Sequence, residues 1–174
     1  MSNLNGMPDT KLKDMEDELD DLAVRILQLM NDNIACKMNM ERAVRSGCLD
    51  LAKTRYILSN TNSVSATKIP TEDLTATTTV VSSQLEEGKS VYELKRETPV
   101  KDSENKSKNT NQDPLKWFGF LVPTNLRQGQ SWFLRAIDYS VQSANISVDM
   151  SVSLDKYSKL INDKNSLKSE IKES

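Results

Sequence analysis

The chain has 174 residues, of which 28% are charged and 37% hydrophobic, and its formal net charge is -2. Such a composition favours one elongated domain with an unstructured part over a large globular core. The near balance of acidic and basic residues provides no overall field to attract nucleic acid, so no nucleic-acid partner is expected.

Residue types that catalysis and metal binding commonly use are scarce. The sequence has no histidine, which removes the commonest general base and metal ligand. Cys36 and Cys48 are not spaced like a zinc knuckle or a disulfide framework, and we expect two reduced, half-buried thiols on helices. The sequence also lacks a phosphate-binding glycine loop. We therefore expect no enzyme activity, no cofactor and no metal.

Membrane-spanning and export signals are not expected either. No run of 18 apolar residues occurs in the sequence. The first 21 residues are polar and acidic, whereas a secretory signal would be basic and then apolar. We therefore expect any contact with a membrane to be indirect.

Hydrophobic residues recur at alternating spacings of three and four from Leu12 to Ala43. This heptad pattern predicts a long helix from Asp9 to Ser46 with one stripe facing a partner helix. Gly47 is expected to end or bend this helix, and Cys48 to Leu58 reads as a further helical segment. Asn33 on the stripe is either tolerated in a thin core or fixes the register. The predicted helix-pairing residues are Leu19, Leu22, Ile26, Leu29 and Asn33.

From Ser59 to Gln112 the chain is rich in Ser, Thr, Asn and Lys and has almost no aromatic residue. Such a segment buries too little apolar surface to offset its ordering entropy, which predicts a low-complexity linker. Within it, Thr77–Leu85 and Ser90–Arg96 flank a turn that contains glycine and predict a short β-hairpin. A two-stranded ribbon by itself is only marginally stable.

A second long helix is predicted from Thr124 or Asn125 toward Ile171. Asp9–Asp21 is strongly acidic and Lys156–Lys172 is rich in lysine, so antiparallel pairing would bring opposite charges together, unless both are simply solvated faces. The predicted fold is therefore all-α: a long antiparallel helical hairpin, or coiled coil, with a disordered or weakly β-structured central linker. Its parts are residues 1–58, 59–112 and 113–174, and the chain is expected to be monomeric by itself.

Every Trp and Phe of the chain lies between Trp117 and Phe133. The rings either pack at the open end of the hairpin or form a binding anchor, because Trp is prominent at protein interfaces. Packing is favoured for Phe120, Leu121 and Phe133, while both interpretations stay open for Trp117 and Phe118. The candidate partner-binding residues in and beside this segment are Pro114, Leu115, Trp117, Phe118, Phe120, Leu121, Pro123 and Arg127.

Two segments resemble a known family. Gln112–Pro123, followed by Leu126–Gln128 and Phe133, resembles the signature of the coiled-coil-domain assembly factors of the vacuolar proton-translocating ATPase (V-ATPase). Leu49–Tyr56 resembles a second family segment, Leu-x-Leu-Ala-Lys-x-Arg-Tyr. The sequence departs from the family pattern in its linker and at Lys116, Phe120 and Trp132.

The resemblance implies a peripheral protein on the cytosolic face of the endoplasmic reticulum. It would pair with a membrane-anchored V-ATPase assembly factor and act as a chaperone for subunits of the pump's membrane sector. The family is also linked to Golgi-directed vesicles, endolysosomes and lysosomal acidification. The alternative function is a coiled-coil trafficking tether or scaffold unrelated to the pump, whose helices associate between chains.

Overall fold

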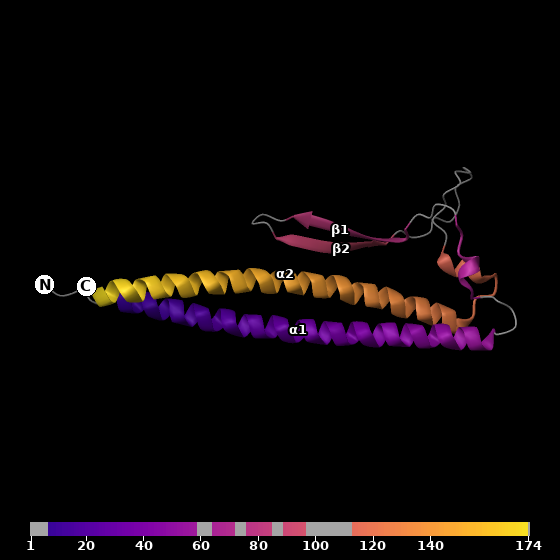
Figure 1. The fold of residues 1–174 in the computed structure, drawn as a ribbon, viewed down its shortest axis with the longest axis horizontal. Coiled ribbons are helices and arrows are strands. Elements are labelled where there is room, and N and C mark those ends of the chain that lie inside the picture. The colour runs from indigo at the N-terminus through magenta and orange to yellow at the C-terminus, as the bar shows by residue number, and fades with distance from the viewer. Residues whose placement is uncertain (1–6, 59–63, 72–75, 85–88, 97–112, 174) are drawn as a thin grey trace.

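The structure, a computed structural model, describes residues 7–58, 64–71, 76–84, 89–96 and 113–173. Most of them belong to two long helices, α1 (Met7–Ile57) and α2 (Thr124–Glu173). Figure 1 shows these helices side by side, with the smaller elements on the side of α2. The smaller elements are η1 (Ala66–Lys68), β1 (Thr78–Gln84), β2 (Ser90–Arg96) and η3 (Pro114–Phe118). The chain is thus mostly helical with one two-stranded antiparallel sheet.

The two long helices run in opposite directions, as the contacts between them show. Near one end, Glu16 of α1 lies 2.8 Å from the Lys164 ammonium of α2, and near the middle Asn33 contacts Ser147. The acidic and basic blocks therefore do meet. The buried apolar side chains of the two helices are Leu19, Ile26, Cys36, Ala43, Leu126 and Ala136. A supercoiled hairpin geometry remains a prediction.

The contact face between the helices contains bonded polar groups. Asn33 is only 8% exposed; its side-chain oxygen accepts a hydrogen bond from the Ser143 hydroxyl at 2.7 Å, and its amide donates to Ser147 at 3.4 Å. Because a buried polar group needs particular partners, these bonds favour the register-fixing interpretation of Asn33. The thiol of Cys36 donates to the Tyr139 carbonyl at 3.1 Å, and burial raises the pKa of this thiol.

The two cysteines differ in exposure. Both are free thiols, but Cys36 is buried and Cys48 is exposed, so the expectation that each is half-buried is wrong. Cys36 lies on the face of α1 that carries Ile26 and Asn33, whereas twelve further residues place Cys48 about 120° around the helix. Rotation about the helix axis therefore decides their burial.

Helix α1 continues through Gly47, so the expected helix end at this residue is wrong. Gly47 lies against Phe133 of α2, where an added Cβ would be 2.9 Å from the ring atom Cζ. Gly129 of α2 is close by, and a Cβ there would lie 3.5 Å from the Gly47 carbonyl oxygen. Gly47 therefore permits a close approach of the two helices.

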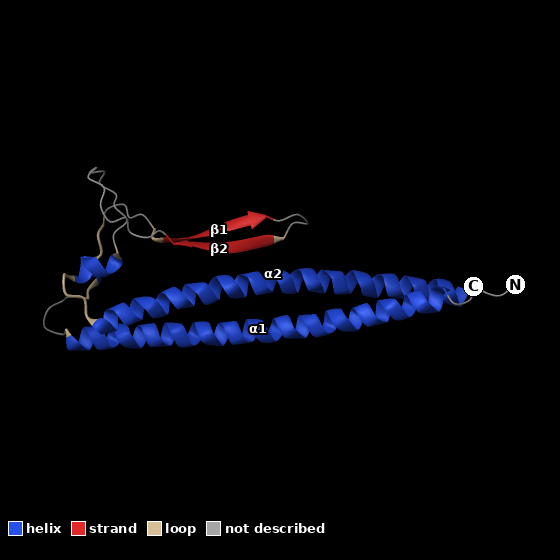
Figure 2. Cartoon of the chain, turned by 180° about the vertical axis from the view of Figure 1, so that it is seen from behind, coloured by secondary structure: helices blue, strands red, loops and turns tan. Residues whose placement is uncertain are grey.

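The predicted β-hairpin is confirmed, with Thr78 opposite Arg96 and Gln84 opposite Ser90. β1 (Thr78–Gln84) begins one residue later than expected, and the expected last residue, Leu85, lies outside the described residues. Figure 2, from behind, shows the same ribbon lying along α2 rather than α1. The ribbon is thus more than a spacer between the long helices, because β2 docks on α2.

Hydrogen bonds and ion pairs hold β2 and the residue before it on α2. The side chain of Asn145 accepts from the Tyr92 amide and donates to the Tyr92 carbonyl, both at 2.9 Å, as a neighbouring strand would. Arg96 pairs with Asp138 at 2.6 Å, and Lys89 pairs with Asp149. An amide side chain carries both a donor and an acceptor, so Asn145 satisfies backbone groups at the outer edge of the ribbon.

Within the described ranges, no helix contains a stretch apolar enough over a sufficient length to span a membrane.

Candidate protein-interaction site

The site lies where α1 ends and α2 begins, and we call this region the connecting end: residues 47–57, 76–78 and 113–137. Its first component is η3, which Asp113 holds in place. The Asp113 carboxylate accepts from the Leu115 amide at 3.1 Å and from the Gln130 side chain of α2, also at 3.1 Å. Asp113 thus caps the short helix and ties it to α2. Pro114 suits the first position because its missing N–H is not needed there.

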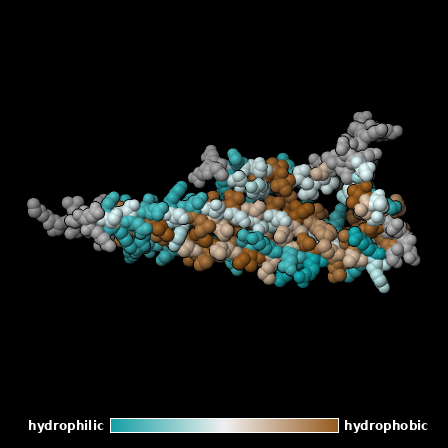
Figure 3. Space-filling view, viewed as in Figure 1, coloured by the Kyte–Doolittle hydropathy of each residue, from teal (hydrophilic) through white to brown (hydrophobic). Residues whose placement is uncertain are grey.

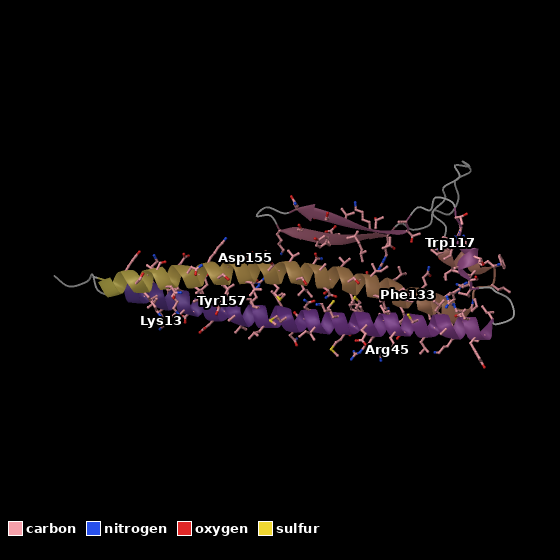
Figure 4. The ribbon with its side chains drawn as sticks, in the orientation of Figure 1. Lys13, Arg45, Trp117, Phe133, Asp155 and Tyr157 are labelled. Carbon is pink, nitrogen blue, oxygen red and sulfur yellow. The ribbon has the colours of Figure 1, made fainter. Side chains whose placement is uncertain are left out.

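The chain then turns outward at Gly119, whose φ of 124° favours glycine. The next two side chains are almost fully exposed: Phe120 at 99% and Leu121 at 88%. The expectation that Phe120 and Leu121 pack as core is therefore wrong, because the turn at Gly119 directs them away from the helices. The same expectation holds for Phe133, which Figure 4 shows between α1 and α2.

A cavity of about 430 Å³ opens beside η3 and the beginning of β1. Mostly apolar residues from four segments line it: Leu51, Ala76, Thr77, Thr78, Pro114, Leu115, Phe118, Leu126, Gly129, Gln130, Phe133, Leu134 and Ile137. Clefts of this volume with few polar groups bind apolar groups of ligands or partners. The cavity and the exposed Phe120 and Leu121 therefore belong to one end of the molecule. Phe120 and Leu121 closely follow the cavity-lining Phe118 in the sequence.

The predicted partner-binding residues fall into three environments. Leu115 is buried, and Pro114, Leu115 and Phe118 line the cavity. Trp117, labelled on η3 in Figure 4, is half-buried, as is Pro123. Phe120, Leu121 and Arg127 are exposed. The structure therefore brings most of them to one end, and their role in binding remains a prediction.

The predicted helix-pairing residues share one face of α1. Leu19, Ile26 and Asn33 are buried, while Leu22 and Leu29 are half-buried. Asn33 is directly bonded to α2. Their individual contributions to pairing remain predictions.

The second family-like segment, Leu49–Tyr56, is divided between two environments. Asp50 and Thr54 are buried, with the Thr54 hydroxyl donating to the Asp50 carbonyl at 2.8 Å, and Leu51 lines the cavity. Leu49 and Tyr56 are instead exposed. The segment therefore both builds the connecting end and presents apolar side chains to solvent.

Sequence reasoning missed several residues that position this site. Asp113 was not among the predicted site residues, although Asp before Pro is a recognisable signal for the start of a helix. Gln130, Gly129 and Asn145 carried no local signal, because their partners are distant in the sequence.

The described ranges were not found to contain a cluster of side chains that could bind a metal ion. Those residues contain no group of three or more His, Cys, Asp and Glu side chains placed to hold an ion. What the connecting end offers is apolar surface, a cavity and a fixed turn. These features define an elongated helical protein with a candidate protein-binding end.

Comparison with known proteins identifies the family. The model of the Vma22/CCDC115 family matches residues 39–136, which is more than half of the chain, and the chain therefore belongs to this family. The match runs from the second half of α1 through the ribbon and η3 into the first quarter of α2. Every residue lining the cavity except Ile137 lies within it.

Three curated relatives carry the same name, vacuolar ATPase assembly protein VMA22. The Homo sapiens protein is 26% identical over 152 residues, covering 76% of this chain and 83% of the human one. The Mus musculus protein is 26% identical over 151 residues, with the same two shares. The Danio rerio protein is 54% identical over 35 residues, which are 20% of this chain and 17% of that protein.

Proposed function

We propose that this chain assists the assembly of the vacuolar ATPase, and that it acts by binding other proteins without catalysis. The observation that carries the proposal is the family match over residues 39–136, together with relatives named for vacuolar ATPase assembly. The matched residues include the cavity, η3 and the exposed turn. The part of the chain that defines the family thus coincides with the part suited to binding.

The finer proposal follows the family resemblance. The chain would act at the cytosolic face of the endoplasmic reticulum, as a peripheral partner of a membrane-anchored assembly factor, and would chaperone the membrane sector of the pump. Through that role it would support lysosomal acidification. The supporting features are an apolar binding end and a pair of helices that resembles a coiled-coil hairpin.

Phe120 and Leu121 are the proposed anchor of this interaction. Large apolar side chains that stay exposed in the folded chain can still bury their apolar surface in the pocket of a partner. Leu115 and Phe118 instead line the cavity of the folded chain, so their truncation would lower stability and binding together. Phe120 and Leu121 therefore give the sharper test, because their removal leaves the fold intact.

The test uses cells that lack the endogenous protein and receive the tagged full-length chain. The double variant Phe120→Ser, Leu121→Ser should unfold at the wild-type temperature but capture the membrane-anchored factor about 30-fold less well, since a lost anchor costs roughly 2–4 kcal/mol. The amount of assembled membrane sector should fall in parallel. The matched control, Val80→Thr with Val81→Thr, changes two adjacent exposed apolar residues on β1 and should behave as wild type.

Two outcomes would contradict different parts of the proposal. Normal capture by the Phe120, Leu121 variant would remove these residues as the anchor and leave the family role standing. If no pump subunit or assembly factor copurifies with the wild-type chain, and its loss leaves pump assembly unchanged, then the assembly function itself is wrong.

The alternative of a trafficking tether requires the helices to associate between chains. In the structure α1 and α2 pair with each other within one chain, through Asn33, Cys36 and Glu16. The α1–α2 contact is thus complete within one chain, and the family match with relatives named for vacuolar ATPase assembly makes the assembly function the better supported of the two.

A further inference from the structure

Helix α1 carries a second row of apolar residues that α2 does not cover. Val24, Leu27, Ile34 and Met38 are each at least half exposed. With Asn31 between Leu27 and Ile34, the row has spacings of three and four, which is again a heptad pattern. We call Val24, Leu27, Asn31, Ile34 and Met38 the outer stripe.

The outer stripe lies on the far side of α1 from α2. Val24 and Asn31 each follow a buried residue, Leu19 and Ile26, by five positions. Five residues correspond to about 140° around an α-helix. Figure 3 shows hydrophobic side chains along the free edge of α1, and in Figure 4 Arg45 points away from α2. A single helix such as α2 cannot cover both faces.

Acidic residues lie at one end of the outer stripe and basic residues at the other. Asp17 and Asp20 continue it toward the start of α1, and Arg42 and Arg45 border its other end. Arg45 also pairs with Glu41 at 2.9 Å, but both groups are well exposed, and such a pair contributes little. The exposed Arg42 side chain donates a long hydrogen bond of 3.5 Å to the half-buried Asn39. These arginines can therefore turn toward a new partner at small cost.

Three pairs of residues on this face lie at equal distances from Asn31, whereas Leu27 and Ile34 are four and three positions from it. Val24 and Met38 are each seven positions from it, Asp20 and Arg42 eleven, and Asp17 and Arg45 fourteen. A two-fold axis at Asn31 would therefore place each aspartate of one chain opposite an arginine of another. The same axis would bring the two Asn31 amides together, a known way to fix the register of paired helices.

We propose that a second copy of this chain covers the outer stripe, through antiparallel pairing of the two α1 helices about Asn31. From Asp17 to Arg45 the contact would span about 42 Å, with two apolar heptads from Val24 to Met38 between the charged ends. The charges favour a second copy of the chain as the partner. An identical antiparallel helix places arginines opposite the two aspartates, whereas an unrelated helix need not carry charges at these positions. The dimer replaces the monomer expected from the sequence and does not depend on the assembly function.

The test measures the mass of the full-length chain by sedimentation over a wide range of concentration. The wild type should dimerise. The variant Asp17→Arg, Asp20→Arg and the variant Arg42→Asp, Arg45→Asp should each dimerise at least about tenfold more weakly, because like charges face each other. An equimolar mixture of the two variants should recover dimers, since every pair is then opposite in charge again.

Two control variants carry the same changes of net charge on exposed residues of α2. They are Asp155→Arg with Asp163→Arg, and Lys156→Asp with Lys159→Asp, and both should remain dimeric. A third test variant, Leu27→Ser with Ile34→Ser, removes exposed side chains and should be monomeric with unchanged helix content by circular dichroism.

Three results would overturn the proposal. The first is a wild-type chain that stays monomeric at the highest concentration, which would assign the stripe to a helix of another protein. The second is a mixture of helical charge variants that fails to recover dimers. The third is a Leu27, Ile34 variant that dimerises as wild type. A dimer would stand whether or not pump subunits are captured, so the two proposals fail independently.

Discussion

The two ends of the helix pair are built by different means. At the end that contains Glu16, α1 and α2 meet through exposed charges: Glu16 lies 2.8 Å from Lys164 and 3.4 Å from Lys168. At the connecting end, glycine and aromatic packing bring the helices close, and a hydrogen bond from Gln130 to Asp113 ties η3 to α2. Figure 3 shows the first end as mostly hydrophilic and hydrophobic residues gathered toward the other.

This difference separates orientation from stability. Exposed ion pairs contribute at most about 1 kcal/mol, so the charged end selects the antiparallel arrangement more than it stabilises it. The connecting end buries side chains from several elements, so changes there should have larger effects. It also carries the exposed turn, so the stable end is the one that presents the binding surface.

The largest expected effect is at Gly47. Replacing it with Leu places a side chain where even a Cβ would be 2.9 Å from the Phe133 ring, and should lower the free energy of unfolding by about 2–3 kcal/mol. Denaturant unfolding measures this change. The exposed control Ala52→Leu should be nearly neutral. The double variant with Phe133→Ala should recover part of the loss, and fully additive effects would contradict the close approach.

A smaller and local effect is expected at Asp113. Asp113→Ala removes the acceptor for the Leu115 amide and for Gln130, which should cost about 1 kcal/mol. Hydrogen exchange should accelerate over residues 115–119 while the central parts of α1 and α2 keep their protection. Asp113→Asn retains an acceptor oxygen and should lose less. Equal acceleration throughout the helices would mean that η3 is not held independently.

The change Asn33→Leu should alter specificity more than stability. It removes two hydrogen bonds but adds apolar burial, so the free energy of unfolding should change by less than about 1 kcal/mol. Cross-links from Lys13 to Lys168 should spread toward Lys159 as other registers become populated. An unchanged cross-link pattern would show that packing alone fixes the register.

The smallest effect concerns Glu16 and pH. Hydrogen bonds from Lys164 and then Lys168 lower the pKa of Glu16. A carboxylate with a lowered folded pKa stabilises the fold above its ordinary pKa, and this stabilisation is lost as pH falls through the folded value. Glu16→Gln should therefore melt slightly below wild type at neutral pH and match it in acid. Glu18→Gln is the control, and an NMR titration of Glu16 at its ordinary pKa would contradict the pairing.

Local patterns in the sequence were sufficient for several features of the fold. The heptad spacing predicted both the helical state and the buried face of α1, because helix geometry places residues three and four apart on one side. The acidic and basic blocks predicted which ends meet. The β-branched residues around a glycine turn predicted the ribbon, and the aromatic segment with Leu49–Tyr56 indicated the family.

The sequence by itself thus determined the long helical segments, the ribbon, the antiparallel charge order and the family, since each depends on residues close together in the chain. Only the tertiary structure decided that Phe120 and Leu121 are exposed, that Gly47 receives Phe133, and that Asn145 docks β2. It also showed that α2 leaves the outer stripe uncovered. The physical reason is that burial and hydrogen bonding depend on partners far away in sequence, whose positions no local pattern specifies.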